Sequence, residues 1–234
     1  MDGNGRWARS RGLSRLAGHG RGVEALRRTV EASLALGLEY LTVFAFSSEN
    51  WGRPDAEVQG LMGLLRRYLR SDVAELHEKG LRLRFIGDHG RLPDDITDLI
   101  SNAENLTADN DSLTLTVALN YGGRRELVSA VRHLAAAAAA GRLDPEGIGE
   151  RQVGAALYTA GLPDPDLIIR TSGERRISNF LLWQSAYSEF IFIDKFWPDF
   201  TKEDLGAAIR DFQSRQRRYG LVEDEEAPPG VGAR

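Results

Sequence analysis

The first residues of the chain combine groups that can hold a phosphate and a metal ion. Residues 2–7 read DGNGRW. Gly3 and Gly5 let backbone N–H groups approach phosphate oxygens closely, and Arg6 adds a guanidinium that can bind two of those oxygens. Asp2 supplies a hard oxygen ligand of the kind that Mg²⁺ takes together with substrate phosphates. Taken alone, the segment is more typical of an ordinary Asp-Gly or Asn-Gly turn.

Two further segments have a similar make-up. Residues 47–53 (SSENWGR) carry two hydroxyls, a carboxylate, a carboxamide and an arginine, although a solvated turn before a helix is an equally good interpretation. Residues 170–178 (RTSGERRIS) place three arginines and three hydroxyls around a glycine. That composition would suit an anion, but it also fits an exposed charge cluster. Glu189 is the remaining carboxylate candidate, and taken alone it is more typical of a surface or paired residue.

Apolar periodicity predicts the elements that position these segments. Short apolar runs rich in β-branched and aromatic residues predict strands at residues 40–46, 81–87, 113–119, 166–170 and 190–193. Apolar residues at helical spacing, bounded by glycine or proline, predict helices at residues 22–36, 54–79, 93–108, 123–140 and 201–219. The first residues read as a loop, and we expect the acidic, proline-rich residues 223–234 to be disordered.

The alternation of strands and helices predicts a single α/β domain at residues 1–222, with a mostly parallel central sheet flanked by helices. Residues 47–53, 120–125 and 170–178 all come directly after strands. Because ligands in such sheets bind beyond the carboxyl ends of the strands, we expect these segments to converge on one site. No strand precedes Asp2, although a glycine loop of this type normally follows one. Either upstream residues lie outside the numbering, or the loop is poorly held.

The composition narrows the classes of function. A net charge of −4 gives no reason to expect nucleic-acid binding. The absence of cysteine excludes disulfides, thiolate catalysis and cysteine-ligated metals. No apolar run approaches the ~20 residues that span a bilayer, and no signal peptide is visible. We therefore expect a cytoplasmic protein that would meet a lipid substrate in a pocket or at the membrane surface.

Longer motifs resemble those of one known family. They are MDGNGRWA at residues 1–8, GH at 18–19, AFSSENWGRP at 45–54, NYGGRRE at 120–126, RTSGERRISNFLLWQSAYSEF at 170–190 and WPDF at 197–200. In this order they are similar to the motifs of the cis-prenyltransferase family, the bacterial undecaprenyl diphosphate synthases in particular. The resemblance extends from residue 1 to about residue 219.

This resemblance implies a homodimeric enzyme that depends on Mg²⁺. It would add isopentenyl diphosphate repeatedly to an allylic diphosphate such as farnesyl diphosphate, forming cis double bonds. The product would be a polyprenyl diphosphate such as undecaprenyl diphosphate, the lipid carrier precursor for cell-wall synthesis, and transient contact with the membrane surface would allow its release. We expect an apolar tunnel for the growing chain, lined by residues such as Ala45, Leu64, Leu69 and Leu113, although core packing explains these four equally well.

The resemblance also implies roles for individual residues. Asp2 would be the essential magnesium-associated carboxylate, and Glu189 would be a second metal ligand. The allylic diphosphate would be held by Gly3, Asn4, Gly5, Arg6, Arg15 and His19, with Trp7 nearby. Isopentenyl diphosphate would be held by Ser47, Asn50, Arg53, Arg170, Arg176 and Ser178, with Ser48, Glu49, Trp51 and Ile177 in the same region. Asn50 would assist proton removal. Arg175 receives no metal role, because relatives often carry His or Gln there.

Three other interpretations were weighed against this one. Asp94, Asp95 and Asp98 spell DDxxD, the magnesium motif of the all-helical trans-prenyl synthases, but acids directly after Pro93 are more typical of a helix N-terminus. The chain could be a non-catalytic partner subunit of a prenyltransferase, although such subunits tend to lose the aspartate that this sequence keeps. It could also be an unrelated nucleotide-binding α/β domain, which would leave the two later arginine-bearing segments unexplained.

Overall fold

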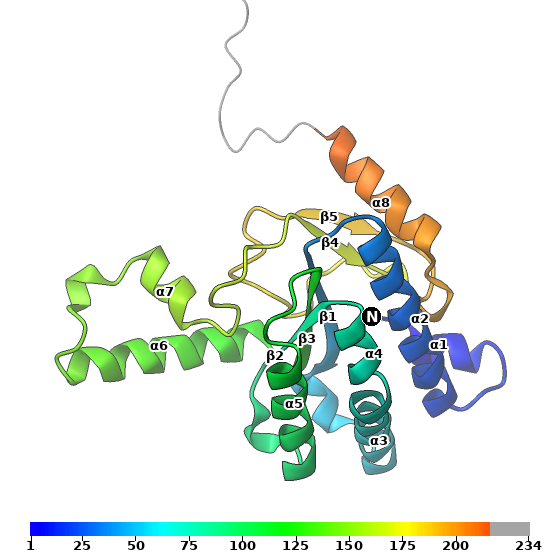
Figure 1. The fold of residues 1–234 in the computed structure, drawn as a ribbon, viewed down its shortest axis with the longest axis horizontal. Coiled ribbons are helices and arrows are strands. Elements are labelled where there is room, and N and C mark those ends of the chain that lie inside the picture. Colours follow the sequence, from blue (N-terminus) through cyan, green and yellow to red (C-terminus); the bar gives the residue numbers. More distant parts are fainter. Residues whose placement is uncertain (216–234) are drawn as a thin grey trace, which may run out of the picture.

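The computed structural model describes residues 1–215, and Figure 1 shows their arrangement. The helices are α1 (Asn4–Arg9), α2 (Arg15–Ala35), α3 (Asp55–Ser71), α4 (Val73–Glu78), α5 (Asp94–Leu106), α6 (Gly123–Ala139), α7 (Glu150–Ala156) and α8 (Lys202–Ser214). The strands are β1 (Tyr40–Ser47), β2 (Leu81–Ile86), β3 (Leu113–Tyr121), β4 (Leu167–Arg170) and β5 (Glu189–Phe192). In this range, no helix is both long and apolar enough to cross a membrane. The tail at residues 223–234 and the end of the last expected helix lie outside the described residues.

The central sheet consists of three parallel strands in the order β1–β3–β2. The middle strand, β3, is buried along almost its whole length, as expected of a parallel strand covered on both faces. Leu113 and Leu115 are fully buried and belong to a core to which α2, α3, α4 and α5 contribute. In a second, smaller core, Ala118 and Tyr121 pack with Leu181. The three strands run in the same direction, so their carboxyl ends lie at one edge.

The last two strands form a separate parallel sheet. β4 pairs with β5 in a register that places Leu167 opposite Glu189 and Arg170 opposite Phe192. The expected α/β domain with parallel strands and flanking helices is confirmed, but its strands form two sheets rather than one. The periodicity of a strand shows that it is buried, whereas its choice of neighbour depends on long-range contacts.

The N-terminal residues form a helix, α1, rather than the expected loop. Gly3 precedes this helix with a φ of 96°, and a Cβ at this position would lie 2.1 Å from the Ser172 hydroxyl oxygen. Only glycine fits such a position. The next helix, α2, begins at Arg15 rather than at Gly22, because the side chain of Ser14 caps it seven residues earlier than the apolar pattern indicates.

The long helix expected at residues 54–79 is divided into α3 and α4. Asp72 stands between them, is buried, and accepts a hydrogen bond of 2.7 Å from Arg27 Nη2 of α2. An ion pair between residues so far apart in sequence leaves no trace in the local apolar pattern. The division is therefore a tertiary feature.

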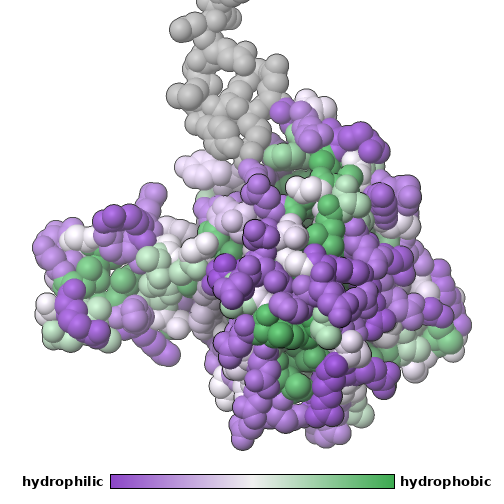
Figure 2. Space-filling view, in the orientation of Figure 1, coloured by the Kyte–Doolittle hydropathy of each residue, from purple (hydrophilic) through white to green (hydrophobic). Residues whose placement is uncertain are grey.

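A helical arm, formed by α6 and α7, projects from the rest of the molecule (Figure 1). Val128 and Val131 of α6 are 49% and 62% exposed. Figure 2 shows hydrophobic residues on this arm within a face that is otherwise largely hydrophilic. The sequence predicted the helix at residues 123–140, but it gave no indication of α7 folding back beside it.

Candidate active site

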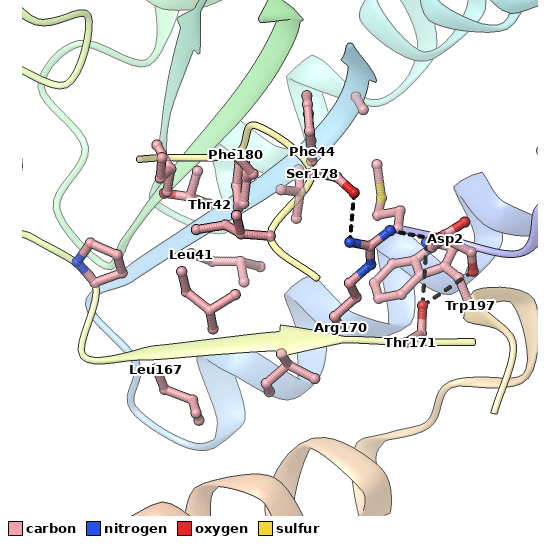
Figure 3. A pocket seen from close by; sticks show the side chains of 18 of the residues that line it. Asp2, Leu41, Thr42, Phe44, Leu167, Arg170, Thr171, Ser178, Phe180 and Trp197 are labelled. Carbon is pink, nitrogen blue, oxygen red and sulfur yellow. Dashed lines mark hydrogen bonds and ion pairs between the residues drawn. The ribbon is translucent and has the colours of Figure 1, made fainter. Parts of the chain in front are cut away.

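A cavity of about 960 Å³ lies between β1 and the β4–β5 sheet. Figure 3 shows Asp2, Arg170 and Ser178 together in this cavity, whereas Leu41, Leu167 and Phe180 lie along another part of its wall. Of the site residues expected from the sequence, those that line it are Asp2, Asn4, His19, Ser47, Glu49, Asn50, Arg53, Arg170, Arg176, Ile177 and Ser178. The structure thus brings residues from 2–7, 47–53 and 170–178 to one cavity that has a charged end and apolar walls. Residues 120–125, which were expected to converge on the same site, do not line it.

The backbone of Asp2 is held in place by residues that are distant in the sequence. Its carbonyl oxygen accepts hydrogen bonds from the Thr171 and Ser172 hydroxyls, at 3.1 and 2.8 Å, and from the Trp197 backbone N–H at 3.0 Å. The expectation of a poorly held loop is therefore wrong. The segment after β4 and the WPDF motif anchor Asp2.

The carboxylate of Asp2 faces the arginine of β4. Arg170 Nη2 donates to Asp2 Oδ2 at 3.0 Å, and Arg6 Nη2 donates to Oδ1 at 3.4 Å. Partial burial alone would raise the pKa of Asp2, but the hydrogen bond and charge of Arg170 outweigh it and hold the pKa below the ordinary value. Asp2 is therefore an ionised carboxylate near neutral pH.

Two arginines, Arg6 and Arg170, contact this carboxylate, and Arg6 shares a second acid, Glu174, with Arg176. Arg170 Nη1 also donates to the Ser178 hydroxyl at 2.8 Å. Glu174 accepts a hydrogen bond from Arg6 at 2.7 Å and another from Arg176. Guanidinium groups gathered in this way suit phosphate oxygens, and an anion that bound them would compete with Glu174.

The segment after β1 forms a short 3₁₀ helix (Ser48–Gly52) that Asn50 stabilises. Its side-chain oxygen accepts a hydrogen bond of 3.1 Å from the Ser47 backbone N–H. Trp51 packs on Phe46 with 5.1 Å between ring centroids, and its indole N–H donates to Asn120 Oδ1 at 2.8 Å. Both ends of the segment are thus tied to the central sheet.

Glu57 joins two arginines and a histidine of the site. It contacts Arg15 Nε at 2.9 Å, Arg53 Nη1 at 3.0 Å and His19 Nε2 at 3.3 Å. Burial alone would raise the pKa of Glu57, but hydrogen bonds from Arg15 and His19 outweigh it and lower the pKa. The sequence analysis missed this residue. The available signal was its position four residues after Arg53 on a predicted helix, where side chains meet.

Asn4 is held by a close approach of α1 to α2. A Cβ on Gly18 would lie 2.2 Å from the Asn4 carbonyl oxygen, and a Cβ on Gly22 would lie 2.7 Å from Asn4 Oδ1. Asn4 Oδ1 is buried and has no hydrogen-bond partner among the described residues. An acceptor in this state, on the wall of the cavity, is available to a donor that enters it.

The remaining expected residues do not line the cavity. The indole N–H of Trp7 donates to Asp199 Oδ1 at 2.7 Å, so its role is to fasten α1 to the WPDF motif. Trp51 and Arg15 act through the contacts given above. The others that lie outside the lining are Gly3, Gly5, Arg6, Ser48 and Glu189.

The two expected metal ligands lie apart in this chain. Glu189 is the first residue of β5, opposite Leu167, whereas Asp2 contacts Arg170 at the end of β4. At ~3.3 Å per residue, about 10 Å of strand separates them. Glu189 instead pairs with Arg215 Nη1 at 2.7 Å. Within residues 1–215, no group of three or more His, Cys, Asp or Glu residues could hold a metal ion.

Only one of the four residues named for an apolar tunnel lies at the cavity. Only Ala45 lines the cavity, whereas Leu69 and Leu113 are packed in the closed core and Leu64 is half-buried on α3. The apolar cavity wall comes instead from β1, β4 and the segment around Phe180. The DDxxD acids lie in α5, with Asp95 bonded to Arg66 Nη2 at 2.9 Å, and none of the three acids lines the cavity.

The parallel α/β fold and a cavity with an arginine-rich end and apolar walls define an enzyme class for substrates with an anionic head and an apolar tail. The chain belongs to the undecaprenyl diphosphate synthase family of prenyltransferases. The profile of the family described as "Putative undecaprenyl diphosphate synthase" matches residues 1–220. The enzyme class that the sequence resemblance implied is thereby confirmed.

Individual relatives agree with this assignment. An isoprenyl transferase of Brucella suis is 58% identical over 95% of this chain and 88% of its own length. The crystal structure of lavandulyl diphosphate synthase from Lavandula x intermedia, in complex with dimethylallyl diphosphate, is similar with a TM-score of 0.91 and 39% identity, over 94% of this chain and 95% of that one. The crystal structure of a probable undecaprenyl diphosphate synthase from Campylobacter jejuni is similar with a TM-score of 0.76 and 32% identity, over 86% of this chain and 92% of that one.

Proposed function

We propose that the chain extends an allylic diphosphate, farnesyl diphosphate in the first instance, by repeated cis addition of isopentenyl diphosphate. The observation that carries this proposal is the cavity between β1 and β4–β5, which joins arginines to apolar walls. The substrates have the same division into a diphosphate head and an isoprenoid tail. The dimethylallyl diphosphate bound to lavandulyl diphosphate synthase supports the proposal, since it is an allylic diphosphate.

In this proposal the allylic diphosphate lies beside α1. Its contacts would come from Asn4, Arg6, His19 and the backbone around Gly3 and Gly5. As the allylic C–O bond breaks, negative charge collects on the departing diphosphate, and fixed guanidinium groups stabilise that charge as it develops. The tail would extend into the apolar part of the cavity along Leu41 and Phe44 of β1.

Isopentenyl diphosphate would lie between the other two segments. Arg53, Arg170 and Arg176 would hold its diphosphate, together with the hydroxyls of Ser47 and Ser178. A new C–C bond forms between its terminal alkene carbon and the allylic carbon as the allylic C–O bond breaks, which leaves positive charge on C3 of the isopentenyl unit. A proton then leaves C2, and its bonding electrons form the new double bond between C2 and C3. Both steps depend mainly on holding the two reacting carbons in contact.

Asn50 would take part in this positioning. Its side-chain oxygen already accepts the Ser47 N–H in the structure. Within the proposal, the carboxamide therefore first holds Ser47 in place, while the Asn50 backbone carbonyl accepts the Arg53 N–H at 3.1 Å. It would assist the departing proton only after that hydrogen bond opens.

Asp2 fits the metal that the family implies. It is an ionised, partly exposed carboxylate beside the arginines, and Mg²⁺ commonly takes one or two carboxylates and completes its shell with phosphate oxygens and water. A bound Mg²⁺ would supply additional positive charge to the leaving diphosphate. Within this chain, Glu189 lies away from Asp2 and pairs with Arg215, so it would have to move to bind a metal held by Asp2.

We include a homodimer in the proposal, because the exposed valines of the α6–α7 arm suit contact with a second copy. Transient membrane contact at product release is also included, since the expected product is a long apolar chain. Undecaprenyl diphosphate is the proposed product, and its chain length is read from the assay below.

The assay combines the protein, farnesyl diphosphate, labelled isopentenyl diphosphate and Mg²⁺, with chromatography of butanol-extractable products. We expect labelled polyprenyl products that disappear when EDTA removes the metal. Asp2→Asn should lower kcat by roughly 100-fold or more, the size of effect seen when a charge-stabilising group is removed. Asp98→Asn, in the exposed DDxxD motif, is the matched control and should keep its turnover. A wild-type protein without product would overturn the proposal.

A further inference from the structure

The motif at residues 120–126 (NYGGRRE) has received no role so far. It lies where β3 ends and α6 begins, between the two segments that would hold isopentenyl diphosphate. Gly122 shows how closely they meet, because a Cβ there would lie 2.7 Å from Ser48 Oγ and 2.8 Å from Asn179 Nδ2. The two neighbouring side chains come from different segments of the chain. Asn179, directly after Ser178, was not among the expected site residues.

The side chain of Asn179 bridges these elements. Its Oδ1 accepts the Arg124 backbone N–H at 2.8 Å, and its Nδ2 donates to Glu49 Oε1 at 2.9 Å. Its backbone carbonyl accepts the Gly123 N–H at 2.7 Å. One carboxamide therefore connects the start of α6 to the 3₁₀ helix that follows β1, and the two partners admit only this orientation of the amide.

The backbone around Asn179 is also fixed. Ser178 and Asn179 take φ values of 49° and 63°, in the left-handed region that non-glycine residues adopt at a cost. The next residue, Phe180, stacks on Phe44 of β1 with 4.7 Å between ring centroids. Such a conformation persists only where surrounding contacts determine it, and here they come from β1 and α6.

Against the effect of burial, the hydrogen bond from Asn179 lowers the pKa of Glu49. Burial alone would raise the pKa of Glu49, but hydrogen bonds outweigh it, with the one from Asn179 the largest of them, and the pKa is lowered. Glu49 is therefore an ionised acceptor for Asn179. Glu49 and Ser178 both line the cavity, so a change in this one hydrogen bond reaches both sides of it.

We propose that Asn179 is a positioning residue that holds residues 47–53 and residues 176–178 at the separation that isopentenyl diphosphate requires. The inference rests on the proposed function and adds a residue to it. Asn179 also lines the cavity, but its carboxamide oxygen and nitrogen are both bonded to protein groups, so in this proposal it acts through Glu49 and Ser178.

The test exchanges the donor and the acceptor of the bridge. Asn179→Asp keeps an oxygen for the Arg124 N–H but sets a carboxylate against Glu49. Adding Glu49→Gln to that variant restores a hydrogen bond with its direction reversed. Asn110→Asp is the matched control, because Asn110 also bridges through its amide, donating to the Leu81 carbonyl at 2.7 Å, but does not line the cavity.

We expect Asn179→Asp to raise the KM for isopentenyl diphosphate roughly tenfold, as for the loss of a hydrogen bond to a charged group, and to change the KM for farnesyl diphosphate less than about twofold. In the Glu49→Gln background, the same substitution should raise the KM for isopentenyl diphosphate less than about threefold. Asn110→Asp should leave both KM values unchanged.

If the wild-type protein is active and Asn179→Asp has an unchanged KM for isopentenyl diphosphate, this inference is overturned while the proposed function stands. An equal increase in the KM for both substrates, without rescue by Glu49→Gln, would also overturn it, since a purely structural residue would give that pattern. Absence of wild-type turnover would overturn the proposed function and, with it, the inference.

Discussion

Glu57 shows how single residues set the electrostatics of the cavity. Its side chain is 10% exposed and meets two arginines and His19. Three groups that would repel one another if all were charged can share one carboxylate, because His19 remains neutral. Burial lowers the pKa of His19 below 6.5, more than its hydrogen bond to Glu57 raises it.

The shifted pKa of His19 gives a pH prediction. As pH falls below about 6.5, the unfolded protein binds a proton at this residue before the folded protein does, so the free energy of unfolding decreases with falling pH. Urea unfolding of the wild type and of His19→Gln at pH 7.5 and 5.5 measures this. The wild type should lose more stability than the variant over this interval, by up to about 1 kcal/mol.

His89, whose pKa is lowered by burial as well, is present in both proteins, so its contribution cancels in the comparison. An equal loss in the two proteins would show that His19 is protonated equally readily in the folded and unfolded states, contrary to the buried environment described here.

At the scale of elements, the contact of α1 with α2 decides where Asn4 lies. Gly18 and Gly22 are one helical turn apart on α2 and face α1, whereas Gly20 faces open space. Alanine is favoured over glycine inside a helix by ~1 kcal/mol. Local propensity therefore favours alanine at all three positions, and only the packing of α1 opposes it.

Gly18→Ala should displace α1, because its Cβ meets a backbone oxygen that cannot rotate away. We expect the KM for farnesyl diphosphate to rise roughly tenfold and the protein to gain none of the helical stability that alanine usually gives. Gly20→Ala is the control and should stabilise the protein by about 0.5–1 kcal/mol with KM unchanged. Steady-state kinetics and thermal unfolding of both variants provide the comparison. The close approach of α1 to α2 would be contradicted by identical behaviour of the two variants.

The same glycines explain part of what sequence reasoning could and could not predict. β1, β2 and β3 were predicted within about two residues at each end, because their apolar runs are dictated by burial in the sheet. The start of α2 was missed because glycines at 18, 20 and 22 weaken the helical signal, although two of them exist for packing. The charged segments and their convergence could be predicted from residue types after strands. Their partners Glu57 and Asn179 could not, since each depends on contacts between elements.

At the scale of the whole molecule, buried polar contacts join the arm to the cavity. Glu126, at the start of α6, is 1% exposed and accepts the Tyr121 hydroxyl, the Tyr158 backbone N–H at 2.9 Å and Gln184 Nε2 at 3.1 Å. Gln184 also lines the cavity. Every bond of this network involves a buried group and is therefore expensive to break, although Gln184 Oε1 itself has no hydrogen-bond partner among the described residues. It fixes the segment that carries Phe180 and Leu181 against the central sheet.

The cavity determines how a prenyl diphosphate can lie in the molecule. The charged end of the cavity and its apolar wall lie in different parts of one space between the two sheets, as Figure 3 shows. An allylic diphosphate can satisfy both only if its head lies beside α1 and Asp2 and its tail runs between β1 and β4.

A crystal structure with Mg²⁺ and a non-hydrolysable thio analogue of farnesyl diphosphate tests this most directly. We expect the diphosphate beside α1 within hydrogen-bonding distance of Arg6, the metal at Asp2, and the isoprenoid tail against Leu41, Phe44 and Phe180. A diphosphate bound outside the cavity, or a tail that leaves the space between β1 and β4, would contradict the account.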